Sequence, residues 1–301
     1  MTARTPVTVL VVAVLAAAVA ACGGGGPSSP AGSGPIPVVA TTTVLADIVA
    51  RVGGNRVSVT SIVPKGGEVH TFDPSPQDVA KVASARLIVA NGLGLDDALT
   101  QLARDSGTSA TIVALGDAVP ASDLILEDGR PNPHAWLDPN LAAAYGRTAA
   151  EALGRIDPAS SAAYATNAEA FATEMAALDH ELQGKFAAVP PANRKIVSFH
   201  DALPYFARAF DLESVGSIVS APGQDPSAGE LAALIDAIRA SGARAVVSEV
   251  QFSDELARTV AAETGATVIG DLYTDTVGDP PVDTLAGILR YDVDRIVAAL
   301  G

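Results

Sequence analysis

Cysteine is almost absent from this sequence, because Cys22 is the only one among 301 residues. A lone cysteine excludes an internal disulfide, and a free thiol in an exported protein needs a specific reason. Tryptophan is equally rare, with Trp136 alone, and there are only four histidines. The places where these rare residues occur are therefore the first places to look for a site.

Basic residues are scarce as well. The chain has 19 Lys and Arg against 34 Asp and Glu, a formal net charge of −15, and without Arg4 the mature chain carries about −16. Such a charge excludes binding to nucleic acid or to anionic lipid by electrostatic attraction. It attracts cations only diffusely, so a specific cation would still need a built site.

Several sequence motifs of enzymes are missing too. The chain contains no HExxH, the helical motif of many zinc hydrolases. Gly92 and Gly94 lack the spacing and the partner acid of a dinucleotide-binding fingerprint. We also find no internal repeat at the residue level.

No apolar run is long enough for a permanent membrane-spanning helix, which needs ~20 residues. The run from Val7 to Ala20 follows a single charge, Arg4, and is typical of a secretory signal peptide, predicted over residues 1–21. It ends in VAAC, which resembles the lipobox of bacterial lipoproteins, where the cysteine becomes the acylated first residue. Lipidation of Cys22 would explain the lone thiol. Residues 22–36, rich in Gly, Ser and Pro, are then expected to form a flexible tether.

The remaining chain is long enough for a large core and shows a β-α-β rhythm. Strands that read as nearly continuous Val, Ile and Leu predict parallel sheets covered by helices on both faces. The rhythm stops for some seventy residues and then resumes. We therefore predict an α/β protein with an N-terminal lobe at residues 37–156, a linking helix at 157–189 and a C-terminal lobe at 190–301.

Two Asp-Pro pairs predict helix starts, each with Asp as the N-cap and Pro in the first turn: Asp138-Pro139 and Asp157-Pro158. The second begins the long linking helix, which at 1.5 Å per residue would run about 45 Å, past both lobes, and leave little room for hinge motion. Its apolar stripe is Tyr164, Phe171, Met175, Leu178, Leu182 and Phe186. His180 lies off this stripe, so we interpret it as solvated helix surface.

Four side chains that can bind a metal follow predicted strands. His70, His134, His200 and Asp275 all lie toward the carboxyl ends of strands, where open α/β sheets bind ligands, and each half contributes two. Three imidazoles and one carboxylate are able to form a tetrahedral metal site. Each residue has a structural alternative: a loop surface for His70 and Asp275, a hydrogen-bonded turn for His134, a strand-end hydrogen bond for His200. The long separations between them leave the question open.

Three acids near these positions allow more than one interpretation. Glu68 would substitute for Asp275 or pair with a mobile loop, but a solvated loop carboxylate is the simpler prediction. Glu249 ends a predicted strand and is either an outer partner of a ligand histidine or an ordinary strand-end acid. Asp201 is predicted to cap the helix that follows it.

Five motifs, in the same order and over almost the whole chain, resemble those of the zinc/manganese solute-binding receptors of bacterial ABC importers. They are GGEVHTFDPSPQD, NPHAWLDP, SFHDALPYFARAF, SEVQFSDELARTVAAETGA and LYTDTV. The resemblance implies two (β/α)4-like lobes with mainly parallel sheets, joined by one long backbone α-helix. It also implies that the metal lies between the lobes.

The family's ligands carry over onto His70, His134, His200 and Asp275. Relatives with His at the third position are associated with zinc and those with carboxylate there with manganese, so Zn²⁺ is expected and Mn²⁺ is the second choice. Two features depart from the family. The segment from Gly116 to Pro133 carries no histidines but four acids, and the second half has no cysteine pair. The four acids are Asp117, Asp123, Glu127 and Asp128.

The resemblance implies a receptor and not an enzyme: an exported monomer, lipid-anchored at the outer face of the cytoplasmic membrane or in the periplasm, that delivers zinc to an ABC permease and ATPase. The alternatives are a manganese receptor, a periplasmic metal chaperone or adhesin, and a zinc hydrolase. A hydrolase needs an open metal position and a general base, which four protein ligands do not leave. Permease and ATPase genes beside this gene would favour import.

Overall fold

A computed structural model describes residues 1–2, 34–127 and 129–301. Residues 3–21 of the predicted signal peptide, Cys22 and most of the tether lie outside the described residues. Residues Pro35–Gly301 form one compact unit. Within the part of the chain that the structure describes, no helix combines the length and the apolar character needed to cross a membrane.

The first half is built on a parallel sheet with the strand order β2-β1-β3-β4. Its strands are β1 (Ile36–Ala40), β2 (Val57–Ser61), β3 (Leu87–Ala90) and β4 (Thr111–Ala114). Its helices are α1 (Thr43–Gly53), α2 (Pro76–Ser84) and α3 (Asp97–Asp105). Every residue of β3 is buried, as expected for a parallel strand covered on both faces.

The second half repeats this plan with the strand order β10-β9-β7-β8, again all parallel. Its strands are β7 (Lys195–His200), β8 (Glu213–Val219), β9 (Ala245–Glu249) and β10 (Thr267–Leu272). Its helices are α6 (Pro204–Ala209), α7 (Ala228–Ser241), α8 (Glu255–Thr264) and α9 (Leu285–Leu300). The predicted class, an α/β protein with two parallel-sheet lobes, is confirmed.

Two long helices fill the gap in the β-α-β rhythm, α4 (Pro139–Ile156) and α5 (Ser161–Phe186). Asp138 caps α4 as predicted, since its side chain accepts the Asn140 amide at 2.9 Å. The predicted start of the linking helix is wrong by one turn: Pro158–Ser160 is a 3-10 turn, and α5 follows it. The Asp157 carboxylate accepts the Tyr164 hydroxyl instead of capping a helix.

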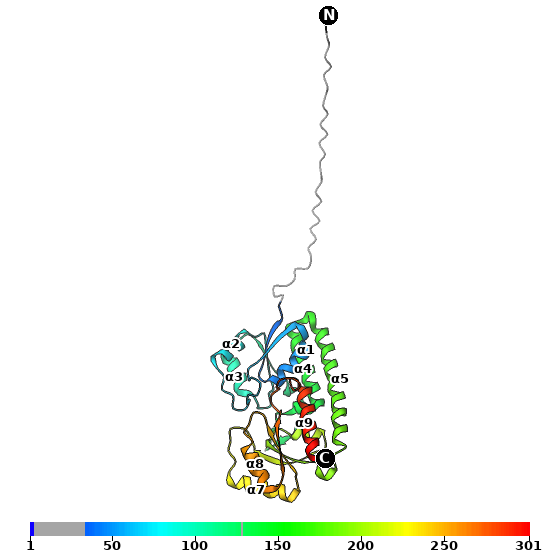
Figure 1. Ribbon diagram of the computed structural model, residues 1–301. Coiled ribbons are helices and arrows are strands. Elements are labelled where there is room, and N and C mark those ends of the chain that lie inside the picture. Colours follow the sequence, from blue (N-terminus) through cyan, green and yellow to red (C-terminus); the bar gives the residue numbers. More distant parts are fainter. Residues whose placement is uncertain (3–33, 128) are drawn as a thin grey trace. The chain divides into compact units, whose positions relative to one another are not determined.

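Helix α5 runs past both halves (Figure 1), packing on α1 and α4 of the first half and on α9 of the second. Its 26 residues make it about 39 Å long. All six residues of the predicted apolar stripe are buried. His180 is exposed, as predicted. The lobe boundaries proposed from the sequence stay predictions.

One continuous apolar core extends through both halves, from Ile36 on β1 to Leu300 at the end of α9. A second, smaller cluster lies in the C-terminal half, where α7 buries only Ile238. Short elements that the sequence did not predict connect the main ones: the two-stranded hairpin β5 (Leu126–Glu127) and β6 (Arg130–Pro131), and the 3-10 turns Gly54–Arg56, Gly116–Ala118, Ala135–Leu137 and Pro191–Asn193.

Candidate metal centre

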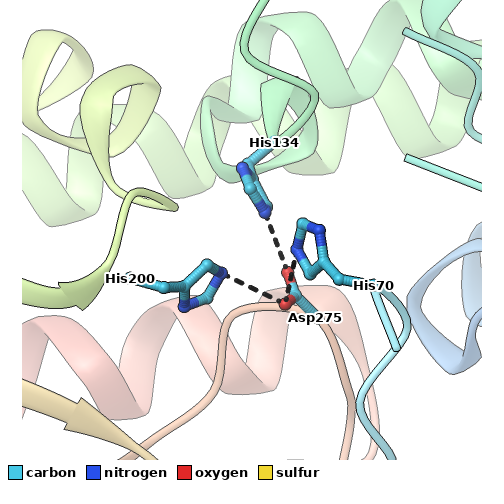
Figure 2. A group of neighbouring side chains, drawn as sticks. All are labelled: His70, His134, His200 and Asp275. Atoms are coloured by element: carbon cyan, nitrogen blue, oxygen red, sulfur yellow. Dashed lines mark ion pairs between the residues drawn. The ribbon is translucent and has the colours of Figure 1, made fainter. Parts of the chain in front are cut away.

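The four candidate side chains come from four separate places in the chain and converge at one point (Figure 2). His70 lies in the loop after β2, and His134 immediately precedes the 3-10 turn that leads to α4. His200 is the last residue of β7, and Asp275 lies three residues beyond the end of β10. One of the four side chains therefore finishes a strand, and the other three lie in segments that follow strands.

The geometry is compact. One ligand atom from each of the four residues lies within 4.8 Å of all the others. Asp275 is the centre of the group: its Oδ1 is 3.4 Å from His134 Nε2, and its Oδ2 is 3.3 Å from His200 Nε2 and 3.7 Å from His70 Nε2. The three imidazole centroids are 5.2 to 5.5 Å apart. This spacing would let a single ion contact all four side chains, and we call the group the cage.

The cage is almost fully buried. His134, His200 and Asp275 are at most 2% exposed, whereas the His70 side chain keeps 17% of its surface accessible. The Nε2 atoms of the three histidines and Asp275 Oδ1 have no hydrogen-bond partner among the described residues. Leaving such atoms unsatisfied is costly, and a cation that binds the carboxylate oxygen and the unprotonated imidazole nitrogens removes the cost. His70 marks the side of the cage nearest to solvent.

Burial and charge divide the three histidines into two kinds. Burial lowers the pKa of His70, and it lowers that of His134 to well below the usual value, so both are neutral at pH 7. Burial opposes a charge on His200 too, but the carboxylates of Glu249 and Asp275 outweigh it and raise its pKa well above the usual value. The pKa of Asp275 is lowered, since the three histidines outweigh its burial. The neighbours of His200 thus favour its charged form in the metal-free site, although burial also raises the pKa of its partner Glu249.

The motif NPHAWLDPN, which carries His134, is hydrogen-bonded to the segment that carries Asp275. The Trp136 ring is fully buried, and its Nε1 donates to the Thr274 carbonyl at 2.9 Å, next to Asp275. Thr276, on the other side of Asp275, accepts the Gly66 amide through its hydroxyl at 2.8 Å. The segment that carries Asp275 is therefore held on both sides by residues of the first half. Trp136 anchors the turn as predicted.

The predictions for Glu68 and Asp201 are wrong, and the contacts of Glu249 decide between its two interpretations. Glu68 is not a solvated carboxylate: its Oε1 accepts the His70 amide at 2.7 Å, and burial, with the charge of Asp275, raises its pKa to about 7. Asp201 does not cap α6, which starts at Pro204 without a side-chain cap. Glu249 lies 3.2 Å from His200 Nδ1, so it is an outer partner of that histidine.

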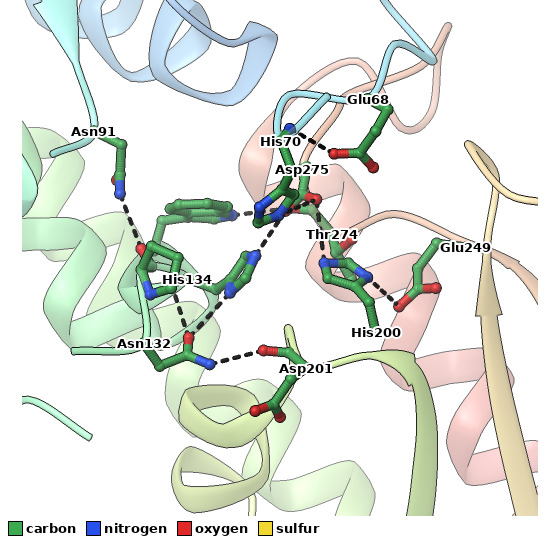
Figure 3. A network of polar contacts seen from close by, with 12 residues as sticks. Glu68, His70, Asn91, Asn132, His134, His200, Asp201, Glu249, Thr274 and Asp275 are labelled. Carbon is green, nitrogen blue, oxygen red and sulfur yellow. Dashed lines mark hydrogen bonds and ion pairs between the residues drawn. The ribbon is translucent and has the colours of Figure 1, made fainter. Parts of the chain in front are cut away.

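Two residues of the site were not identified from the sequence. Asn132 contacts His134, and Gln251 Nε2 lies 3.4 Å from Asp275 Oδ2 (Figure 3 shows Asn132 and its neighbours). Both lie inside motifs quoted above, but an amide side chain gives no signal of its own. The only available clue was the place of Asn132, two residues before His134.

Known proteins with similar sequences and structures bind metals. The manganese-binding lipoprotein MntA of Halalkalibacterium halodurans is 29% identical over 265 residues, which cover 87% of this chain and 88% of that protein. The iron-binding protein YfeA of Yersinia pestis is 32% identical over 269 residues, which cover 88% of this chain and 86% of that protein.

Solved structures show the same fold. The Mn-bound periplasmic metal binding protein from Candidatus Liberibacter asiaticus matches with a TM-score of 0.78 at 27% identity, covering 88% of this chain and 99% of that one. The periplasmic zinc binding protein TroA of Treponema pallidum matches with a TM-score of 0.81 at 24% identity, covering 89% and 99%. A family model described as zinc-uptake complex component A, periplasmic, matches residues 38–299. Because that match spans nearly the whole folded part, the chain belongs to this family of metal ABC transporter substrate-binding proteins.

Proposed function

We propose that this protein captures Zn²⁺ with high affinity outside the cytoplasmic membrane and delivers it to an ABC permease. The observation that carries the proposal is the donor set: three imidazole nitrogens and one carboxylate oxygen, all within 4.8 Å of one another. Zinc takes four such ligands in a tetrahedral arrangement. His70, His134, His200 and Asp275 would each supply one ligand atom.

The choice of zinc over manganese follows from the same donors. Imidazole suits zinc, while manganese prefers carboxylate, carbonyl and water oxygens. Three of the four donors here are nitrogens, and the only ligand carboxylate is Asp275. Similar proteins are named for manganese, iron and zinc, so the family alone does not select the ion.

A receptor fits the cage better than a hydrolase does. Four protein ligands complete a tetrahedral zinc site and leave no position for a water nucleophile, which catalytic zinc requires. A metal chaperone or an adhesin would use the same binding chemistry. Delivery of zinc to liposomes that contain the permease and its ATPase distinguishes a receptor from these two.

The test is metal content and competition on the purified mature chain. We expect one zinc per chain after expression, and zinc displacing manganese when both are present. Because zinc binds the folded state, it should also raise the unfolding temperature, with a gain of about 2.7 kcal/mol when free zinc is 100 times Kd. Retention of manganese in the presence of equimolar zinc would contradict the proposal.

Zinc binding should depend on pH. The raised pKa of His200 favours its charged, doubly protonated form in the metal-free protein, and zinc can bind Nε2 only after that nitrogen has lost its proton. Affinity should therefore fall as pH falls, by about tenfold per pH unit while one proton is displaced. His70 and His134 are already neutral and add to the slope only at lower pH.

Titration calorimetry at pH 7, in buffers with different heats of ionisation, measures this as release of about one proton per zinc. His180→Ala should leave the count unchanged, since His180 is exposed on α5. An affinity that stays constant from pH 7.5 to 5 would exclude three histidine ligands.

We also propose that Cys22 anchors the mature protein to the membrane through a lipid. Cys22→Ser removes the only thiol, so the variant should either appear in the soluble exported fraction or accumulate as uncleaved precursor. Fractionation of cells followed by detergent extraction measures this. A serine variant that still partitions with membranes and is released by detergent would show that another feature anchors the chain.

A further inference from the structure

We propose that Asn132 is a positioning residue: it holds His134 in the tautomer that presents Nε2 to the metal, and it ties His134 to the segment that carries His200. The inference rests on the proposed function, because it assigns a role within the same metal site. It depends on four contacts of one side chain. Figure 3 shows the two with His134 and the one with the Asp201 carbonyl, and the fourth is with Glu127.

The orientation of the Asn132 amide follows from its neighbours. The backbone N–H of His134, which can only donate, lies 3.0 Å from Oδ1. On the other side, Nδ2 lies 2.7 Å from the Asp201 carbonyl and 3.0 Å from a carboxylate oxygen of Glu127, which can only accept. Exchanging the amide oxygen and nitrogen would set donor against donor and acceptor against acceptor. Oδ1 therefore faces His134.

This orientation determines the tautomer of His134. Its Nδ1 also lies 3.0 Å from Asn132 Oδ1, an atom that only accepts, so Nδ1 has to carry the proton. In a neutral imidazole the other nitrogen, Nε2, then keeps its lone pair. Nε2 is the atom that faces Asp275 Oδ1 at 3.4 Å, in the middle of the cage. Asn132 thus prepares His134 as a ligand before any metal arrives.

The same side chain joins the two halves. Asp201, whose carbonyl accepts from Asn132 Nδ2, directly follows His200 at the end of β7. Beside this side-chain contact, the Tyr205 hydroxyl, on α6, donates to the backbone carbonyl of Asn132 at 3.0 Å, a bond that a change of the Asn132 side chain leaves in place. Both contacts cross from the first half to the second. These two hydrogen bonds hold the turn of His134 at a fixed place relative to His200. A bound ion therefore leaves only when these bonds break or when its ligand side chains rotate away.

Asn132 and Glu249 each lie beside one histidine of the cage, but their side chains differ in chemistry. Each contacts Nδ1 of one histidine and leaves Nε2 facing the cage. Glu249 offers a carboxylate, whereas Asn132 offers a neutral oxygen. An amide fixes the tautomer without adding charge to the buried cage, and it also supplies the Nδ2 donor that a carboxylate lacks. This double use explains why an amide, and not an acid, occupies position 132.

Two variants separate the two roles. Asn132→Leu has a similar size but neither accepts from His134 nor donates to Asp201. Asn132→Asp keeps an acceptor for His134, but it replaces the donor by an oxygen that is repelled by the Glu127 carboxylate. Asn167→Asp is the matched control, because Asn167 Nδ2 donates to the Val52 carbonyl at 2.8 Å, between α5 and α1.

The first readout is the tautomer of His134 in the metal-free mature chain, from ¹H–¹⁵N correlation spectra of the imidazole nitrogens. Its signals are identified by their absence from His134→Gln. We expect the Nδ1–H form in the wild type, Asn132→Asp and Asn167→Asp. In Asn132→Leu we expect mainly Nε2–H, because the Asp275 carboxylate then attracts the proton.

The second readout is zinc release into excess chelator. Asn132→Leu should lose about 10–100-fold in affinity, seen as faster release, and Asn132→Asp should also release zinc faster because the tie to Asp201 is lost. Asn167→Asp should match the wild type. An unchanged tautomer in folded Asn132→Leu overturns the positioning role, and a wild-type release rate in Asn132→Asp overturns the tie between the halves. If Asn132→Leu fails to fold, Asn132→Ser takes its place.

The tautomer is measured without metal, so it does not depend on which ion the protein carries. Failure of the wild type to bind zinc would refute the proposed function, whereas a wild-type His134 in the Nε2–H form would refute the role of Asn132.

Discussion

Asp275→Ala should lose essentially all zinc binding at concentrations that saturate the wild type, an effect larger than the about 100-fold typical of losing an outer partner. Asp275 is the only negatively charged ligand candidate in the cage and lies within 3.7 Å of all three imidazoles. Its loss removes one of four donors and the negative charge that attracts the cation. Zinc titration against a chelating dye measures the effect.

Three further variants make this prediction specific. His200→Ala also removes a donor and should lose zinc to a similar degree. His180→Ala should bind as the wild type does, because His180 lies on the exposed face of α5. Glu68→Ala should keep the four ligands, since Glu68 bonds the backbone N–H of His70 and not its imidazole, and is not among the four converging residues. Wild-type binding by Asp275→Ala together with loss in Glu68→Ala or His180→Ala would show that other residues form the site.

Asp275→Ala should still fold. Each half has its own parallel sheet, and the apolar core does not depend on Asp275. Circular dichroism of the metal-free variant checks this, so that a loss of zinc binding is not confused with a loss of structure.

His200→Glu should change the selectivity of the site from zinc toward manganese. The substitution replaces an imidazole nitrogen by a carboxylate oxygen, which weakens zinc binding more than manganese binding. The ratio of the two affinities, measured by competition in one titration, should therefore fall by at least about tenfold. A ratio equal to that of the wild type would contradict the assignment of His200 as a ligand.

The structure adds a condition to this experiment. Glu249 lies 3.2 Å from His200 Nδ1 and is fully buried, so a glutamate at position 200 would face a second carboxylate. Two buried carboxylates at that range repel each other and tend to hold a proton. The double variant His200→Glu/Glu249→Gln removes the repulsion and should bind manganese more tightly than the single variant. The single variant Glu249→Gln serves as the control.

The parts of the fold that follow local rules were predictable from the sequence. Continuous apolar runs such as Leu87–Ala90 predicted buried parallel strands, and the stripe from Tyr164 to Phe186 predicted the long helix. Strand ends also gave the four converging side chains, because carboxyl ends of parallel strands present their loops to one edge of a sheet. The choice of these four as metal ligands came from resemblance and stays a prediction.

The missed features depend on contacts between distant residues. Asn132 is linked to Asp201 across 69 positions, and Trp136 to Thr274 across 138. Nothing local marks Glu68 as partly buried, since its environment comes from Asp275 and Glu249, far away in the chain. The start of α5 was predicted wrongly because the Asp157 carboxylate accepts the Tyr164 hydroxyl and does not cap the helix. A 3-10 turn lies between Asp157 and α5.

The large apolar core that both halves share affects how the ion enters and leaves. Helix α9 of the second half packs on α1 of the first, and apolar side chains from Ile36 to Leu300 form one cluster. Swinging the halves apart would expose this surface at about 2.5 kcal/mol per 100 Å² of apolar area. If the separation exposed ~200 Å² of apolar area, fewer than about one molecule in a thousand would have its two halves apart. We therefore expect the protein, when it is not docked on a permease, to exchange its ion through small displacements near His70. Wide separation of the two halves requires energy from outside the chain.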